Sequence, residues 1–184
     1  MTTIYSFAPI VDRHAEILIL GSMPGRASLS ANQYYAYPQN AFWRIMGELL
    51  YFNPAVASYT EKIAALKKAH IALWDVLQSC RRKGSLDSSI ETQSQTINDF
   101  QSFFHQYRRI RYVFFNGGKA ETCFKRYVLN KDVPDSIRLL QLTRLPSTSP
   151  ANATLSFARK REQWHQLLSG GLPVPYHSNE KISV

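Results

Sequence analysis

Cysteine is nearly absent from this sequence of 184 residues, which contains only Cys80 and Cys123. Two thiols are too few for the disulfide framework of a small secreted domain, and too few for a four-cysteine iron–sulfur or zinc site. The five histidines, at positions 14, 70, 105, 165 and 177, lack the spacing of metal ligands. The sequence therefore predicts no disulfide scaffold and no metal site.

Long apolar runs are missing as well, because no stretch approaches the roughly 18 apolar residues of a membrane span. The opening segment, MTTIYSFAPIVDRHAE, has no basic region before its short apolar part, unlike a secretory signal peptide. We therefore expect a cytoplasmic protein, associated with the nucleoid if it is bacterial or archaeal, that has no membrane partner and acts as a monomer.

Acidic residues are scarce relative to basic ones, with 13 Asp and Glu against 22 Lys and Arg and a formal charge of +9. This balance favours a polyanionic partner, although a basic protein without a nucleic-acid role has the same composition. The hydrophobic fraction of 45% suits a globular fold with a sizeable core. We expect one domain over residues 1–170 and a loosely held tail over residues 171–184, which has two prolines and no periodicity.

Apolar runs and helical patterns alternate along the chain. Short apolar runs predict strands at residues 17–20, 71–76, 112–115 and 137–142. Helical spacing predicts helices at 40–50, 55–70, from a cap at Thr96 or Asn98 to Tyr107, at 119–129, and at 157–168 ended by Gly170 and Gly171. Residues 1–14, 22–39 and 77–90 are expected to be irregular.

Strands that alternate with helices predict an α/β fold, with a central four-stranded parallel sheet covered on both faces. Right-handed crossovers would bring the loop after each strand to one edge of the sheet. Open α/β sheets bind ligands at this edge, so the loops after the strands are the candidate site.

The densest such stretch lies between Ile17 and Leu50. Gly21 and Gly25 bracket a tight turn, Ser22-Met23-Pro24, whose backbone can approach a ligand closely. A segment rich in tyrosine and amide side chains follows, and the next helix begins near Asn40. This order places a polar and aromatic loop at the carboxyl end of a buried strand.

These residues resemble a known family. GSMPG followed by QYYAYPQNAFW is similar to the first motif of the uracil-DNA glycosylase superfamily, and most similar to its hypoxanthine-DNA glycosylase (DNA-deoxyinosine glycosylase) branch. WDVLQSC through GSLD (residues 74–87) and LPSTSPAN (residues 145–152) extend the resemblance. A lone glycine turn would be weak support, but three motifs in order are specific.

The resemblance implies a three-layer sandwich with strand order 2-1-3-4. It also implies a monofunctional enzyme of base excision repair that needs no cofactor. Such an enzyme flips a deaminated base out of double- or single-stranded DNA and cleaves its N-glycosidic bond with water. Hypoxanthine is the first expected base, followed by uracil and xanthine.

Asn40 is the catalytic candidate, because an amide oxygen can accept a hydrogen bond from the attacking water. In related mismatch-specific enzymes the water-positioning asparagine occupies the glycine turn, where this chain has Met23, and a thioether cannot orient water well. The resemblance to the hypoxanthine branch assigns the role to the asparagine of the PxN motif, which is Asn40. The alternative is that Asn40 only caps the helix beginning at Ala41.

The other substrate-binding candidates have structural alternatives too. Tyr35 matches the aromatic residue that stacks on the flipped base, or it packs in the core. Asp75 could orient a base edge or a loop, as could Asp87. The backbone of the glycine turn would donate hydrogen bonds to the leaving base, through Gly21, Ser22, Met23 and Gly25. Gln33, Tyr34 and Tyr37 are weaker candidates for the same pocket.

Two segments are expected to contact DNA phosphates. The resemblance implies that the loop after the fourth strand enters the minor groove, where Ser147, Thr148 and Ser149 offer short hydroxyl donors. Leu145 replaces the histidine that many uracil enzymes carry there, so no imidazole can act on the leaving base. Arg81, Arg82 and Lys83 would grip phosphate, or form an ordinary solvated face.

Three rival functions remain open from the sequence. A mismatch-specific uracil or thymine glycosylase would share the motifs. A non-catalytic nucleic-acid-binding module would explain why the turn carries Met23 in place of an amide. A small-molecule α/β hydrolase could use the same edge, but Asn116-Gly117-Gly118-Lys119 lacks the spacing of a phosphate loop, so nucleotide hydrolysis is not expected.

Overall fold

The computed structural model describes residues 2–129 and 133–169. The expected tail at residues 171–184 and the expected helix end at Gly170 and Gly171 lie outside the described residues. A four-stranded parallel sheet forms the centre, in the order β3-β2-β6-β7. Its strands are β2 (Ile17–Gly21), β3 (Ile71–Asp75), β6 (Tyr112–Asn116) and β7 (Gln141–Leu145). The predicted α/β class and the strand order 2-1-3-4 are thereby confirmed.

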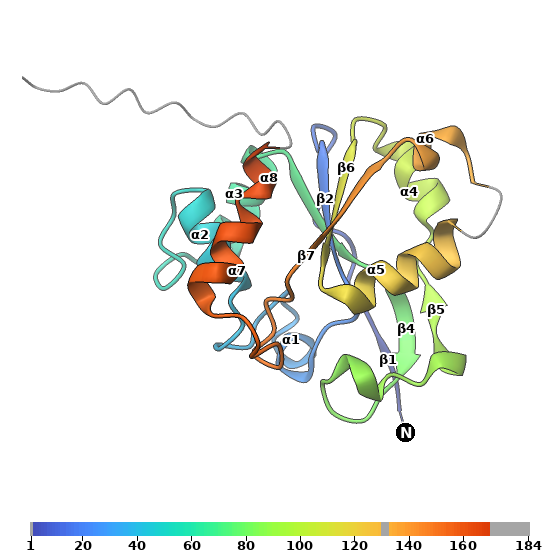
Figure 1. The fold of residues 1–184 in the computed structure, drawn as a ribbon, viewed down its shortest axis with the longest axis horizontal. Coiled ribbons are helices and arrows are strands. Elements are labelled where there is room, and N and C mark those ends of the chain that lie inside the picture. Colours follow the sequence, from blue (N-terminus) through green and yellow to red (C-terminus); the bar gives the residue numbers. More distant parts are fainter. Residues whose placement is uncertain (1, 130–132, 170–184) are drawn as a thin grey trace, which may run out of the picture.

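The sheet separates two hydrophobic cores, because successive side chains of a strand point to opposite faces. In β2, Leu18 and Leu20 pack on one side while Ile17 and Ile19 pack on the other. Figure 1 shows α2, α3, α7 and α8 on one side of the sheet and α4, α5 and α6 on the other. Burial on both faces explains why β2, β3 and β6 read as largely apolar runs, whereas the edge strand β7 keeps Gln141 and Arg144 exposed.

The helices largely follow the predicted pattern. Their bounds are α2 (Phe42–Leu49), α3 (Tyr59–Lys68), α4 (Phe100–Gln106), α5 (Gly118–Phe124), η3 (Lys125–Leu129), α6 (Asp135–Arg138), α7 (Phe157–Trp164) and α8 (Gln166–Ser169). A capping box between Ser58 and Glu61 starts α3. The predicted helix at 157–168 is divided into α7 and α8.

Two boundaries predicted from the sequence are wrong. The fourth strand begins at Gln141 rather than at residue 137, because Pro134 precedes a short helix in which Ile137 is buried. Asp99, not Thr96 or Asn98, caps α4 by accepting from the backbone N–H of Ser102. Asn98 is instead buried, and its Nδ2 donates to the Asp75 carbonyl at 2.8 Å.

Segments expected to be irregular also contain regular structure. β1 (Thr3–Tyr5), β4 (Leu77–Arg81) and β5 (Thr96–Ile97) form a small antiparallel sheet, and residues 26–31 form α1 (Arg26–Ala31). In β4, Leu77 and Cys80 are fully buried beside exposed Gln78 and Arg81. This polar composition hid the strand, because only tertiary packing decides which of its side chains are buried. η1 (Asp87–Ser89) and η2 (Thr92–Ser94) connect β4 to β5.

Candidate active site

A cavity of about 680 Å³ opens at the carboxyl ends of β2, β3 and β6. It is lined by residues 21–28, Tyr34, Tyr35, Tyr37, Asn40, Asp75, residues 85–88, Asn116 and residues 147–152. α1 and the segment after β7 lie close together at the bottom of Figure 1. The three motifs therefore converge on one cavity, as the parallel topology predicts.

The glycine turn after β2 is tied to the second motif. The carbonyl oxygens of Gly21 and Ser22 accept from Val76 and Leu77 backbone N–H groups at 2.8 and 3.1 Å. Ser22 Oγ donates to Asp87 Oδ1 at 2.7 Å. A Cβ at position 21 would overlap Asp75 Oδ1, so only glycine lets this carboxyl reach the strand end.

Asn40 holds the start of α2. Its Oδ1 accepts from the Phe42 backbone N–H at 2.9 Å, and its own N–H donates to the Tyr37 carbonyl at 2.9 Å. Ala41 is the N-cap position and the helix begins at Phe42. The amide oxygen has two lone pairs, so one remains for a water molecule in the cavity. The structural role is thus observed, and the catalytic role stays a prediction.

Tyr35 lines the cavity, and its ring stacks on that of Phe42. The ring centroids lie 4.1 Å apart with an interplanar angle of 25°. Its backbone is left-handed, with φ of +54°, and its buried hydroxyl makes no hydrogen bond of good geometry with a described residue. Burial, and then the Asp75 carboxyl, raises the pKa of Tyr35, so the phenol is neutral. The geometry fits both core packing and base stacking.

Asp75 ends β3 and is almost completely buried, with 3% of its surface exposed. Its Oδ2 is buried without a hydrogen-bond partner in the described part of the chain. Burial, with a smaller contribution from the Asp87 carboxylate, raises the pKa of Asp75 to about 8, against the opposing effect of Arg82. A strongly shifted carboxyl in a cavity is typical of a functional site.

The loop after β7 is fixed by Asn116, which sequence reasoning missed as a site residue. Its Oδ1 accepts from the Thr148 backbone N–H at 2.8 Å, and its Nδ2 donates to Thr148 Oγ1 at 2.9 Å. Thr148 is 1% exposed, so the expectation that its hydroxyl binds phosphate is wrong. Ser147 and Ser149 remain partly exposed in the cavity wall. Asn116 is the polar residue that ends the apolar strand β6, and this position could have indicated a site residue from the sequence.

Helix α7 holds the loop after β7 in place through two buried side chains. Lys160 is buried and its Nζ donates to the Ser149 carbonyl at 3.2 Å. Trp164 is fully buried and its Nε1 donates to the Pro146 carbonyl at 3.0 Å. Neither residue lies in the recognised motifs, and both act by positioning the loop.

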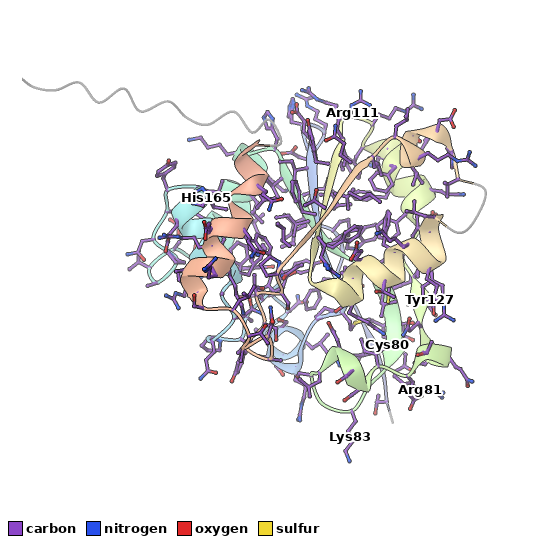
Figure 2. The ribbon with its side chains drawn as sticks, in the orientation of Figure 1. Cys80, Arg81, Lys83, Arg111, Tyr127 and His165 are labelled. Carbon is purple, nitrogen blue, oxygen red and sulfur yellow. The ribbon has the colours of Figure 1, made fainter. Side chains whose placement is uncertain are left out.

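The basic trio after β4 divides into two kinds of residue. Arg81 and Lys83 are exposed, with Arg81 Nε 2.9 Å from Glu91 Oε2, and Figure 2 shows both at the lower end of the molecule. Arg82 is only 6% exposed, and its guanidinium donates to Pro24 O at 2.6 Å and to Gly84 O at 3.1 Å. The expectation that Arg82 grips phosphate is therefore corrected: it braces the glycine turn.

A second cavity, of about 840 Å³, is lined by parts of α4 and α6. It includes Arg111, which Figure 2 places at the end of the molecule opposite to Lys83. None of the predicted site residues lines it. Although it is larger, it lacks the motif residues and the shifted carboxyl, so the cavity at the carboxyl ends of the strands is the candidate site.

The described residues bring no three His, Cys, Asp or Glu side chains together as metal ligands. Cys80 and Cys123 are buried and form no disulfide bond. Over the same described ranges, no helix is long and apolar enough to cross a bilayer.

Known proteins are similar to this chain in sequence and in fold. The Uracil DNA glycosylase superfamily profile matches residues 8–168. Two curated proteins named Hypoxanthine DNA glycosylase, from Methanosarcina barkeri and Methanosarcina acetivorans, are 38% and 40% identical over 114 residues, which is 62% of this chain and 71% of each relative. A solution NMR structure of a candidate uracil DNA glycosylase from M. acetivorans has a TM-score of 0.72 and 32% identity, over 91% of this chain and 99% of that one.

Proposed function

Since the chain belongs to the uracil-DNA glycosylase superfamily, we propose that it is a monofunctional DNA glycosylase that excises hypoxanthine from DNA as a monomer. The observation that carries this proposal is the convergence of Asn40, Tyr35 and Asp75 on one cavity at the sheet edge. Its volume of about 680 Å³ is large enough to enclose a flipped purine.

Each residue has a part in the proposed reaction. The flipped base stacks on Tyr35, while Asn40 Oδ1 holds a water molecule near C1′ of the sugar. The backbone of the turn at Gly21–Gly25 donates hydrogen bonds to the base as negative charge develops on it. Ser147 and Ser149 contact the phosphates beside the flipped nucleotide.

The same cavity favours hypoxanthine and simple hydrolysis over the alternatives. Met23 occupies the turn position where mismatch-specific uracil and thymine enzymes carry an amide, so we place uracil after hypoxanthine. None of the described residues lining the cavity is a lysine, which leaves no amine there for a Schiff base with the sugar. The proposal therefore includes base release without strand cleavage.

The direct test uses labelled duplexes that contain inosine, uracil or xanthine, followed by treatment with alkali. We expect alkali-dependent strand breaks first at inosine. Binding without base release from any duplex would favour a non-catalytic module, and release of base only from free nucleosides would favour a small-molecule hydrolase.

Excess EDTA is expected to leave hypoxanthine release unchanged. The proposed nucleophile is a water molecule held by an amide, and the cavity offers no cluster of metal ligands among the described residues. The measurement is the single-turnover rate before and after chelation. Loss of activity in EDTA that an added divalent ion restores would contradict the proposed mechanism.

Replacing both Arg81 and Lys83 by alanine is expected to weaken binding to damaged and undamaged duplex alike. Each lost phosphate contact should lower the slope of log affinity against log salt by about one. Glu91→Gln is the matched control, because it removes the Arg81 ion pair and keeps both cations. A loss of affinity confined to damaged DNA would contradict phosphate contact.

Arg82→Ala is expected to act on stability instead. It leaves the carbonyl oxygen of buried Pro24 without its donor, and an unpaired buried group costs about 1–3 kcal/mol. Thermal denaturation should therefore show a lower melting temperature. If the Arg82→Ala protein has wild-type stability and weakened DNA binding, Arg82 contacts phosphate after all.

A further inference from the structure

Asp75 is a buried acid that forms no ion pair with any described residue. Among the described residues, no cation lies within ion-pair distance of it, and none donates a hydrogen bond to either carboxyl oxygen. A Cβ at position 21 would overlap Asp75 Oδ1 and lie 3.0 Å from Tyr35 Oη. The carboxyl thus packs against the end of β2 beside the Tyr35 hydroxyl, in the wall of the cavity. An ionised carboxylate in this position would be strongly disfavoured.

The charged and titratable groups that act on Asp75 come from three segments of the chain. Asp87 of η1 repels a negative charge on it, whereas Arg82 after β4 attracts one. Nε and Nη2 of the Arg82 guanidinium donate to backbone carbonyl oxygens, while its Nη1 is buried without a hydrogen-bond partner among the described residues. Tyr34 and Tyr35 contribute neutral phenols, and a further cation, Lys119, acts on Asp87. Asp87 itself accepts from Ser22, so of the two acids it is the better placed to carry the charge.

We propose that Asp75 is neutral in the working enzyme and donates a hydrogen bond from its carboxyl group to a keto oxygen of the flipped base. This inference rests on the proposed function. Hypoxanthine, uracil and xanthine each carry a keto oxygen where adenine, cytosine and guanine carry an amino group. A neutral carboxyl can therefore favour the deaminated base, while an ionised one would repel its oxygen and attract the amino group of the undamaged base.

The same hydrogen bond assists the chemical step. As the C1′–N9 bond breaks, its electron pair stays on the purine and spreads toward the keto oxygen. The water oxygen bonds to C1′ and gives up one proton, and the departing purine takes up one proton, so the overall charge is unchanged. Asp75 keeps its own proton, and its hydrogen bond strengthens as the purine becomes negative. The raised pKa of about 8 agrees with a carboxyl that is neutral at pH 7.

Asp75→Asn tests the proposal, because an amide can donate the same hydrogen bond at every pH. We expect wild-type single-turnover rates on inosine duplex to fall by about tenfold for each pH unit above about 8. Asp75→Asn should be less than about tenfold slower at pH 7, and faster than the wild type at pH 9.5. Asp75→Ala, which cannot donate, should be slower than Asp75→Asn throughout. Ionisation of the substrate itself affects the three proteins equally.

Two rate outcomes would overturn the inference. If Asp75→Asn is as inactive as Asp75→Ala at every pH, an ionised carboxylate is required, as for a general base. If Asp75→Asn retains the alkaline loss seen in the wild type, another group causes it. Asp87→Asn should move the alkaline loss to lower pH, because it removes the charge that raises the pKa of Asp75.

Thermal denaturation of the protein without DNA gives an independent readout. With its pKa raised to about 8, the folded state holds the Asp75 proton up to about that pH, whereas a carboxyl in the unfolded chain loses it near the ordinary aspartate pKa of 3.8. Stability from this group is therefore lost as pH rises between these values, so Asp75→Asn should gain stability relative to the wild type across that window. If the difference in stability between Asp75→Asn and the wild type does not change with pH, Asp75 is ionised when folded. An enzyme that releases no base at all would refute the proposed function, while this titration would still decide the state of Asp75.

Discussion

Asn40→Ala is expected to slow single-turnover release of hypoxanthine by about two to three orders of magnitude, the usual effect of losing one positioned polar group at a reaction centre. The Phe42 backbone N–H holds Asn40 Oδ1 in one orientation at 2.9 Å, leaving its second lone pair for the attacking water. The turn residue Met23 cannot replace this amide. Affinity for inosine duplex should change little, because the side chain contacts water rather than DNA.

The structural role of Asn40 requires its own control. Losing the hydrogen bond to Phe42 at the helix start costs about 1 kcal/mol, so the melting temperature is measured beside the rate. Asn40→Asp keeps an acceptor for both Phe42 and water, and should preserve stability with partial activity. If Asn40→Ala releases hypoxanthine from inosine DNA at the wild-type rate, the only role of Asn40 is to stabilise the start of α2.

Tyr35→Ala should slow base release by about tenfold to a hundredfold, since stacking of a base on an aromatic side chain is worth about 1–3 kcal/mol. Tyr35→Phe should retain most activity, because the buried hydroxyl makes no hydrogen bond of good geometry with a described residue. Tyr35→Leu is the matched variant that keeps apolar bulk over Phe42 and removes the ring face.

The three variants separate stacking from packing. If Tyr35→Leu is as active as the wild type, the ring only fills space. If Tyr35→Ala fails to fold while Tyr35→Leu folds and is active, core packing is its role. Equal inactivity of Tyr35→Ala and Tyr35→Phe would instead reveal a contact from the hydroxyl.

Local sequence was sufficient to predict the framework of the site. Runs such as Ile17–Leu20 are apolar because both faces of the parallel sheet are covered, and this burial leaves a short-range pattern. The loops that follow these strands therefore had to meet at one edge. Asn40, Tyr35 and Asp75 were placed in one cavity by that argument and by the motifs of the superfamily.

Segments without such a pattern were predicted poorly. β4 mixes buried and exposed residues, and its partners β1 and β5 are short, so its register is set by contacts far along the chain. α1 has only six residues and lies in a turn-rich segment. Elements this short gain their stability from tertiary packing rather than from local propensity.

By itself, the sequence determined the α/β class, the edge of the sheet that carries the site and most residues of the cavity. Only the tertiary structure decided what those residues do there. Arg82 and Thr148 looked like surface contacts for phosphate, yet their partners, Pro24 and Asn116, lie 58 and 32 residues away and bury them. The same holds for the carboxyl of Asp75, because its burial and its lack of a hydrogen-bond partner among residues 2–129 and 133–169 depend on contacts that no local pattern records.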